Sequence, residues 1–271
     1  MCLRRTAGDI KINYLSVRLE EYRRVNMEEK RSLFLLYILS FIILIFTLCV
    51  VCATKAFADD NDMEEEKVIY LTFDDGPSYI VTDIVLDTLK EKDVKATFFV
   101  VGNKIEGREQ ILKRIHEEGH SIGLHTFTHK YKKVYTSHGS FIEEMEDTAD
   151  EVNKVLGFKP NIIRFPAGSK PFLNEKLLEK LHEKDYRVYD WNASLSDGLN
   201  YKTPTDKLVR EAHKVVGKSY SKIFLLMHCD QTNKTTAEAL PRIIDYYKAL
   251  GYQFKAINED TPEYYFRFKT K

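Results

Sequence analysis

The chain has 271 residues, 44% of them hydrophobic, and its 41 basic and 41 acidic side chains give a formal net charge of zero. A chain of this length can bury a full core, and a single domain of about 200 residues fits within it. Residues 1–58 carry nine Lys or Arg and five Asp or Glu, which leaves a net charge of −4 on residues 59–271. No basic stripe with interleaved aromatic residues appears, so the composition argues against a nucleic-acid partner.

The first element in chain order is an uncharged run of 21 residues, Leu33–Ala53, with the sequence LFLLYILSFIILIFTLCVVCA. About 20 apolar residues are enough to cross a bilayer as a helix. Basic residues precede the run, and the acidic stretch Asp59–Glu66 follows it. By the positive-inside rule we expect a cytoplasmic tail (1–32), a span in the lipid bilayer (33–54), an acidic linker (55–66) and an extracellular domain (67–271).

Two fates of the apolar segment stay open. The tripeptide Ala56–Ala58 has the small-x-small form of a signal-peptidase site, and cleavage there predicts a secreted protein. The run is long for a signal-peptide core, which favours an uncleaved single-pass anchor in the cell membrane. Met27 is an alternative start. Of the four cysteines only Cys229 follows the span, so the outer domain is predicted to have no internal disulfide.

From Lys67 onward, short β-branched and aromatic runs alternate with amphipathic helical patterns. The predicted strands are Val68–Phe73, Ala96–Val101, Ser121–Leu124, Ile162–Phe165, Arg187–Trp191, Lys222–Met227 and Gln253–Ile257. The clearest predicted helices are Ile80–Lys92, Arg108–Gly119, Phe141–Gly157 and Asn174–Lys184. This alternation predicts an α/β fold with a parallel sheet of about seven strands, either a closed (β/α) barrel or an open doubly wound sheet.

Polar residues collect where the predicted strands end. They are Asp74 and Asp75 in TFDDGPS, His125 and His129 in HTFTH, Arg164 and Pro166 in RFPAGS, Asp190 and Trp191 in DWN, and His228 in LLMHCD. The carboxyl ends of parallel strands lie on one face of a barrel, so these side chains are expected to share one site.

The residue types in these motifs indicate a metal centre. Two adjacent aspartates repel each other, and a cation removes that conflict. One carboxylate and two neutral imidazoles form a three-ligand site with a position left for water, and the other aspartate remains free as a base. This ligand set suits Zn²⁺, with Co²⁺ or Ni²⁺ as workable substitutes.

In order along the chain, TFDDGPS, HTFTH, RFPAG, DWN and LLMH resemble the five motifs of the polysaccharide deacetylase family, the NodB-homology domain of carbohydrate esterases. The resemblance covers roughly Lys67–Ile257, and its first two motifs are very specific. It implies a distorted (β/α) barrel and metal-dependent removal of N-acetyl groups from amino-sugar polymers.

The resemblance also implies roles for individual residues. Asp75, His125 and His129 match the metal ligands, and Asp74 matches the catalytic base. Arg164 is similar to the arginine that orients the base, His228 to the catalytic acid, and Asp190 to the carboxylate that supports the acid. The substrate-binding positions are Pro166, Ala167, Trp191 and Leu226, of which Trp191 and Leu226 match residues lining the pocket for the acetyl methyl group.

The chain departs from the family pattern at two positions. Ala167 follows Pro166 where an aromatic residue is frequent, and Leu124 stands where Asn is frequent before the first metal histidine. Neither change removes a catalytic group, but the first reshapes the sugar-binding groove. The expected substrate is a cell-wall polysaccharide, namely the N-acetylglucosamine of peptidoglycan.

Several alternatives remain for the function. The same barrel could deacetylate chitin-type oligosaccharides or N-acetylmuramic acid, hydrolyse a different amide, or bind carbohydrate without catalysis. The sequence does not indicate a protein partner.

Overall fold

The structure, a computed structural model, describes residues 7–59, 66–217 and 220–268. The chain divides into two compact units, Met1–Glu64 and Glu65–Lys271. Of the acidic linker predicted at 55–66, residues 60–65 lie outside the described residues, and residues 55–59 are helical.

The first unit contains one long helix, α1 (Ala7–Asp59). Its segment Glu20–Val50 is the only one in the described part of the chain that is long and apolar enough to cross a membrane, judged by length and composition. The predicted span Leu33–Ala53 lies inside α1 and overlaps this segment. An unbroken helix satisfies its own backbone hydrogen bonds, which a spanning segment requires.

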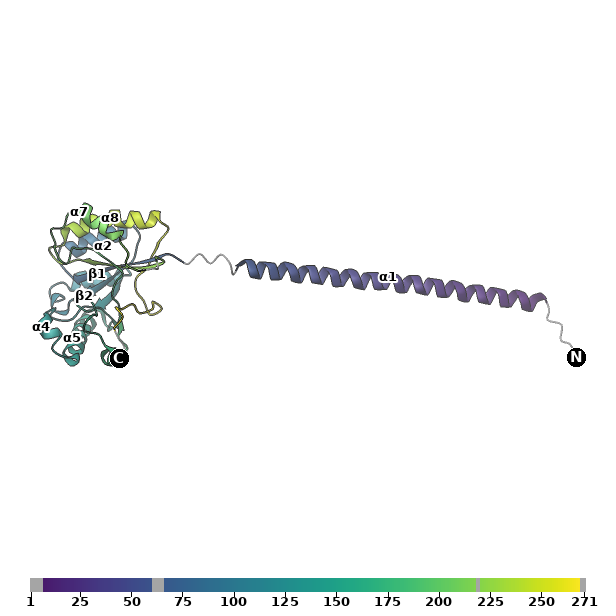
Figure 1. Cartoon of the computed structure of the whole chain (residues 1–271), viewed down its shortest axis with the longest axis horizontal. Coiled ribbons are helices and arrows are strands. Elements are labelled where there is room, and N and C mark those ends of the chain that lie inside the picture. Colours follow the sequence, from purple (N-terminus) through teal and green to yellow (C-terminus); the bar gives the residue numbers. More distant parts are fainter. Residues whose placement is uncertain (1–6, 60–65, 218–219, 269–271) are drawn as a thin grey trace. The chain divides into compact units, whose positions relative to one another are not determined.

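The second unit is built on one sheet of eight strands (Figure 1). The strands are β1 (Val68–Gly76), β2 (Ala96–Val100), β3 (Ser121–Leu124), β4 (Ile162–Ile163), β5 (Arg187–Val188), β6 (Ala193–Ser194), β7 (Lys222–His228) and β8 (Gln253–Phe254). Their order is β5-β4-β3-β2-β1-β7-β6, with β8 paired to the start of β1, and these strand pairings are parallel.

The two edge strands of this sheet, β5 and β6, are neighbours in the chain. Only five residue steps separate Val188 from Ala193, a reach of at most about 18 Å, so the chain itself crosses the open side of the barrel. The predicted distorted (β/α) barrel is therefore confirmed. Of its details, β6 was not predicted, and the strand expected at Arg187–Trp191 is shortened to β5.

Helices cover the outside of the sheet. They are α2 (Val81–Glu91), α3 (Glu109–Glu117), α4 (Tyr131–Val134), α5 (His138–Leu156), α6 (Glu175–His182), α7 (Thr205–Ala212) and α8 (Lys234–Ala249), with a 3₁₀ turn at Gly102–Lys104. Figure 1 shows α2, α7 and α8 on one side of β1 and β2, and α4 and α5 on the other. The amphipathic pattern predicted helices at the positions of α2, α3, α5 and α6, and the structure confirms all four.

Strand periodicity divides the core into two layers. In β1, Ile69, Leu71 and Phe73 join the large cluster that packs against the helices, whereas Val68 and Tyr70 join a smaller cluster inside the barrel. Alternate residues of a strand face the same side. Thr72 and Asp74 therefore follow Val68 and Tyr70 towards the barrel interior.

Candidate active site

The two aspartates at the end of β1 reach the same cavity in different ways. Asp74 faces the interior because of the strand period. Asp75 should face the opposite way, but its backbone is left-handed (φ 70°) and the register with β2 shifts between Asp74 and Gly76. Gly76 allows the close approach of β7, because a Cβ there would lie 2.8 Å from the sulfur of Cys229. This irregularity turns both carboxylates into one cavity.

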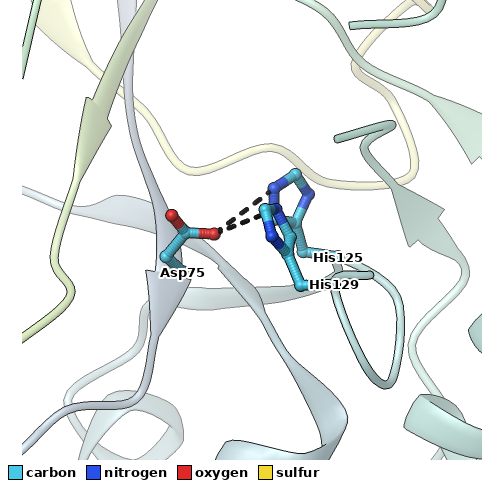
Figure 2. A group of neighbouring side chains, drawn as sticks. All are labelled: Asp75, His125 and His129. Carbon is cyan, nitrogen blue, oxygen red and sulfur yellow. Dashed lines mark ion pairs between the residues drawn. The ribbon is translucent and has the colours of Figure 1, made fainter. Parts of the chain in front are cut away.

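His125 and His129 face Asp75 from the end of β3 (Figure 2). The Nε2 atoms of the two rings lie 3.7 and 3.3 Å from Asp75 Oδ1. His125 Nδ1 lies 2.9 Å from the carbonyl oxygen of Arg164. Since a carbonyl only accepts hydrogen bonds, Nδ1 donates to it, and in the neutral ring this leaves the lone pair of Nε2 facing Asp75.

Asp75 has the properties of a metal ligand. Its Oδ1 is buried and has no hydrogen-bond partner within the described part of the chain. Burial raises the pKa of Asp75, but His125, His129, His228 and Lys104 together lower it below its ordinary value. Potential ligand atoms of Asp75, His125 and His129 all lie within 4.8 Å of one another, so a single cation fits among them.

Asp74 is held by the fully buried Arg164, which follows β4. Arg164 Nη1 donates to Asp74 Oδ1 (2.9 Å) and to Thr72 Oγ1 (2.7 Å). The rest of the guanidinium donates to the carbonyl oxygens of Tyr189 and Asp190, at 2.8 and 3.0 Å. Arg164 thus fixes the orientation of the Asp74 carboxylate, whose other oxygen lies 3.6 Å from His125 Nε2.

His228, at the end of β7, lies across the cavity and is paired with Asp197. Its Nδ1 is 3.0 Å from Asp197 Oδ1, and its backbone N–H donates to Asp197 Oδ2 at 2.8 Å. Burial lowers the pKa of His228, but the hydrogen bond and charge of Asp197, with Asp74 and Asp75, raise it to about 9. A Cβ on Gly198 would come within 2.3 Å of the ring, so the glycine makes room for the imidazole.

The predicted pairing of Asp190 with His228 is wrong. The buried Asp190 carboxylate instead accepts hydrogen bonds from the backbone N–H of Ser169 (2.9 Å) and of Phe266 (2.7 Å). The reason is strand parity: Tyr189 joins the interior cluster, so its neighbour Asp190 points to the other side. That parity was readable in the sequence. Asp197 was missed because it lies in a loop without a periodic pattern.

The reactive groups line a cavity of about 310 Å³. Its walls are formed by Asp74, Asp75, His125, His129, Tyr131, Ala167, Trp191, Ser194, Leu195, Gly198, Leu199, Leu226 and His228. Three of the four predicted substrate-binding residues are among them. Pro166 is not, and its carbonyl oxygen accepts a hydrogen bond from Tyr135 (2.7 Å). Sequence patterns did not indicate Tyr131 or the wall from Ser194 to Leu199.

Comparison with known proteins gives consistent results. A family model described as polysaccharide deacetylase matches residues 61–189. The chain is 35% identical to a peptidoglycan-N-acetylglucosamine deacetylase of Bacillus cereus, over 73% of this chain and 72% of the relative. It is 33% identical to the peptidoglycan-N-acetylmuramic acid deacetylase PdaA of Bacillus subtilis, over 72% of each chain.

Solved structures show the same similarity. The polysaccharide deacetylase Bc1974 from Bacillus cereus matches with a TM-score of 0.67 and 34% identity, over 73% of this chain and 95% of that one. The catalytic domain of a peptidoglycan N-acetylglucosamine deacetylase from Eubacterium rectale matches with a TM-score of 0.67 and 28% identity, over 76% and 96%. The chain therefore belongs to the polysaccharide deacetylase family of hydrolases, which act on N-acetyl amides.

Proposed function

We propose that this protein is a metal-dependent deacetylase of the N-acetylglucosamine residues of peptidoglycan, held at the outer surface of the cell membrane by α1. The observation that carries the proposal is the buried Asp75 Oδ1, which has no hydrogen-bond partner among the described residues and faces two imidazole nitrogens. On either side of it stand a carboxylate held by arginine and a histidine paired with a carboxylate.

Asp75, His125 and His129 would hold the cation. The donor set of one carboxylate and two imidazoles suits Zn²⁺, and Co²⁺ or Ni²⁺ can substitute. When bound, such a cation lowers the pKa of a water molecule and polarises a carbonyl oxygen. The proton on His125 Nδ1 is committed to the Arg164 carbonyl, so its Nε2 is free to act as a ligand.

Asp74 takes the part of the base. Amide hydrolysis requires that the attacking water lose a proton, and Asp74 is the carboxylate in the cavity that has no place in the ligand set. The hydrogen bond from Arg164 keeps the Asp74 carboxylate aimed at the cavity.

His228 takes the part of the acid, because an amine leaves only when its nitrogen is protonated. With its pKa raised to about 9, the ring is an imidazolium at neutral pH. Asp197 is a positioning residue that holds Nδ1 and leaves Nε2 for the leaving nitrogen. Trp191 and Leu226 would contact the acetyl methyl group.

The choice of peptidoglycan rests on the relatives and on the anchor. The relatives include peptidoglycan deacetylases named for N-acetylglucosamine and for N-acetylmuramic acid. A domain held on the outer membrane surface lies next to the wall. N-acetylmuramic acid and chitin-type oligosaccharides are the alternative substrates.

A measurement of acetate release tests both the proposed substrate and the requirement for a metal. Purified protein is incubated with peptidoglycan and with chitooligosaccharides, with and without a chelator, and muropeptide masses identify the sugar that loses its acetyl group. We expect release from peptidoglycan N-acetylglucosamine that stops with chelator and returns with Zn²⁺ or Co²⁺. Acetate release unaffected by exhaustive chelation would refute the metal-dependent mechanism.

The assignment of the base gives a separate prediction. Asp74→Asn should keep its metal but lose roughly a hundredfold or more in turnover, the usual contribution of general acid–base catalysis. His228→Ala is the matched variant: it should also lose amide hydrolysis but recover part of its rate on an activated acetate ester, whose leaving group needs no proton. Normal turnover by Asp74→Asn would contradict the assignment.

A further inference from the structure

The loop that joins the two candidate metal histidines has an unfavourable backbone conformation. Thr126 and His129 both have positive φ values, 68° and 53°. Left-handed conformations are uncommon for residues other than glycine and persist only where the surroundings hold them. In this loop they fold the chain back so that the His125 and His129 rings stand side by side, with centroids 5.0 Å apart (Figure 2).

The buried carboxylate of Glu144, on α5, holds this loop by accepting hydrogen bonds from N–H groups of the loop. Glu144 is 1% exposed. Its Oε2 accepts from the backbone N–H of Phe127 (2.9 Å) and of Thr128 (2.7 Å), and Oε1 accepts from Thr128 Oγ1 (3.0 Å). Successive N–H groups converging on one anionic oxygen form a concave anion site made by the backbone.

The other polar groups of the loop are held by different partners. The carbonyl oxygens of Thr126 and Phe127 accept from the N–H groups of Gly102 and Asn103, each at 3.0 Å. His125 is fixed independently: its backbone N–H donates to the carbonyl oxygen of Val100 on β2 (2.8 Å), and its ring contacts the Arg164 carbonyl. The N–H of His129 itself donates to Thr126 Oγ1 (3.2 Å), a bond within the loop. The two N–H groups that bind Glu144 are what ties this loop, and with it His129, to α5.

We propose that Glu144 is a positioning residue for the metal centre, which sets metal affinity by holding His129 in its left-handed conformation. The inference rests on the proposed function, because it assigns His129 to the ligand set. Without the carboxylate, two N–H groups lose their acceptor, the loop relaxes, and the 3.3 Å approach of His129 Nε2 to Asp75 Oδ1 is lost. If Glu144 only tied α5 to the loop, its replacement would lower the stability of the protein and leave its metal affinity unchanged.

Metal affinity of the full-length protein in detergent separates these two roles. Zn²⁺ dissociation constants are measured by competition with a chromophoric chelator, and the visible spectrum of the Co²⁺ form reports ligand geometry. Glu144→Ala should bind Zn²⁺ at least about tenfold more weakly, as is typical when a group supporting a ligand is removed, with an altered Co²⁺ spectrum. Glu144→Gln keeps one acceptor oxygen and should show a smaller loss in the same direction.

Two matched variants serve as controls. Lys133→Met removes the exposed ion pair to Glu144 Oε1 but leaves the loop hydrogen bonds, so Zn²⁺ affinity should change by less than about threefold. Val85→Ala opens the core on α2 and lowers the denaturation midpoint without changing Zn²⁺ affinity.

The outcomes distinguish the two levels of the proposal. A folded Glu144→Ala protein with wild-type Zn²⁺ affinity and Co²⁺ spectrum overturns the role of Glu144, and if that variant does not fold, wild-type values for Glu144→Gln do the same. If instead His125→Ala retains stoichiometric Zn²⁺, the ligand assignment itself fails, whatever Glu144 does.

Discussion

At the scale of single residues, the pairing of His228 with Asp197 sets the protonation state in which the His228 ring meets the substrate. Asp197 is fully enclosed: besides His228 it accepts from Thr236 Oγ1 at 2.9 Å, and its backbone carbonyl accepts from the Asn233 amide at 3.2 Å. A carboxylate in this setting keeps its position and favours the charged imidazolium.

The pH dependence of activity should therefore change when Asp197 loses its charge. His228 is active as the protonated acid, so activity falls as the pH rises through its pKa of about 9. Asp197→Asn removes the carboxylate that contributes most to raising this pKa, while burial still lowers it, so the alkaline limb of kcat/KM should move to lower pH. Stopped acetate assays across the pH range measure this shift.

Asp190→Asn is the matched control for that experiment. Its side chain bonds to Ser169 and Phe266, so the alkaline limb should stay in place even if the protein is less stable. A limb that moves with Asp190→Asn and not with Asp197→Asn would contradict the pairing.

At the scale of elements, Arg164 joins three strands that lie far apart in the sequence. From the end of β4 it bonds Thr72 and Asp74 on β1 and the carbonyl oxygens of Tyr189 and Asp190 just after β5. Its guanidinium also lies 4.1 Å from the centroid of the Phe99 ring on β2. One side chain thus connects the end of β1, which carries the proposed base Asp74, with the segment that follows β5.

Removing this tie should destabilise the barrel. Arg164→Met leaves the Asp74 carboxylate and two carbonyl oxygens buried without a partner, and breaking a buried ion pair in this way typically costs about 3–5 kcal/mol. Urea unfolding of the metal-free protein at pH 7 measures the loss. Arg164→Lys keeps the charge but cannot make all four bonds, so we expect an intermediate loss. A cost below about 1 kcal/mol for Arg164→Met would mean that the network contributes little.

At the scale of the whole molecule, the chain consists of two units with different distributions of apolar side chains. The long helix of the first unit carries exposed apolar side chains from Leu33 to Val50, whereas the second unit has its own buried core. Apolar side chains on all sides of a helix are stable in lipid and unfavourable in water.

The charges around the candidate span predict that the second unit (Glu65–Lys271), here called the catalytic unit, lies outside the cell membrane. Arg23, Arg24, Lys30 and Arg31 precede the span and acidic residues follow it, which favours a cytoplasmic N-terminus. Protease added to intact cells stripped of their wall should digest the catalytic unit while leaving a cytoplasmic marker protein intact. Protection of the unit until the membrane is permeabilised would reverse the proposed orientation, and release into the medium would indicate cleavage near Ala58.

Features that depend on local periodicity and local chemistry could be predicted from the sequence. Asp74, His125 and His228 follow predicted strands, and the period of two places them on one face of the sheet. The two aspartates and two histidines identify the type of site. The apolar run of α1 is likewise readable from composition alone. The prediction for Asp190 followed the motif and was wrong, because the structure turns its side chain towards Ser169 and Phe266.

The tertiary structure decided the partnerships between side chains far apart in the chain. His228 meets Asp197, 31 residues away, and Arg164 meets Asp74, 90 residues away. Asp75 faces the cavity only because the backbone at the end of β1 is irregular, and Glu144 reaches the histidine loop only because α5 packs beneath it. Such contacts depend on how loops and helices pack in three dimensions, and no repeating pattern along the chain encodes that packing.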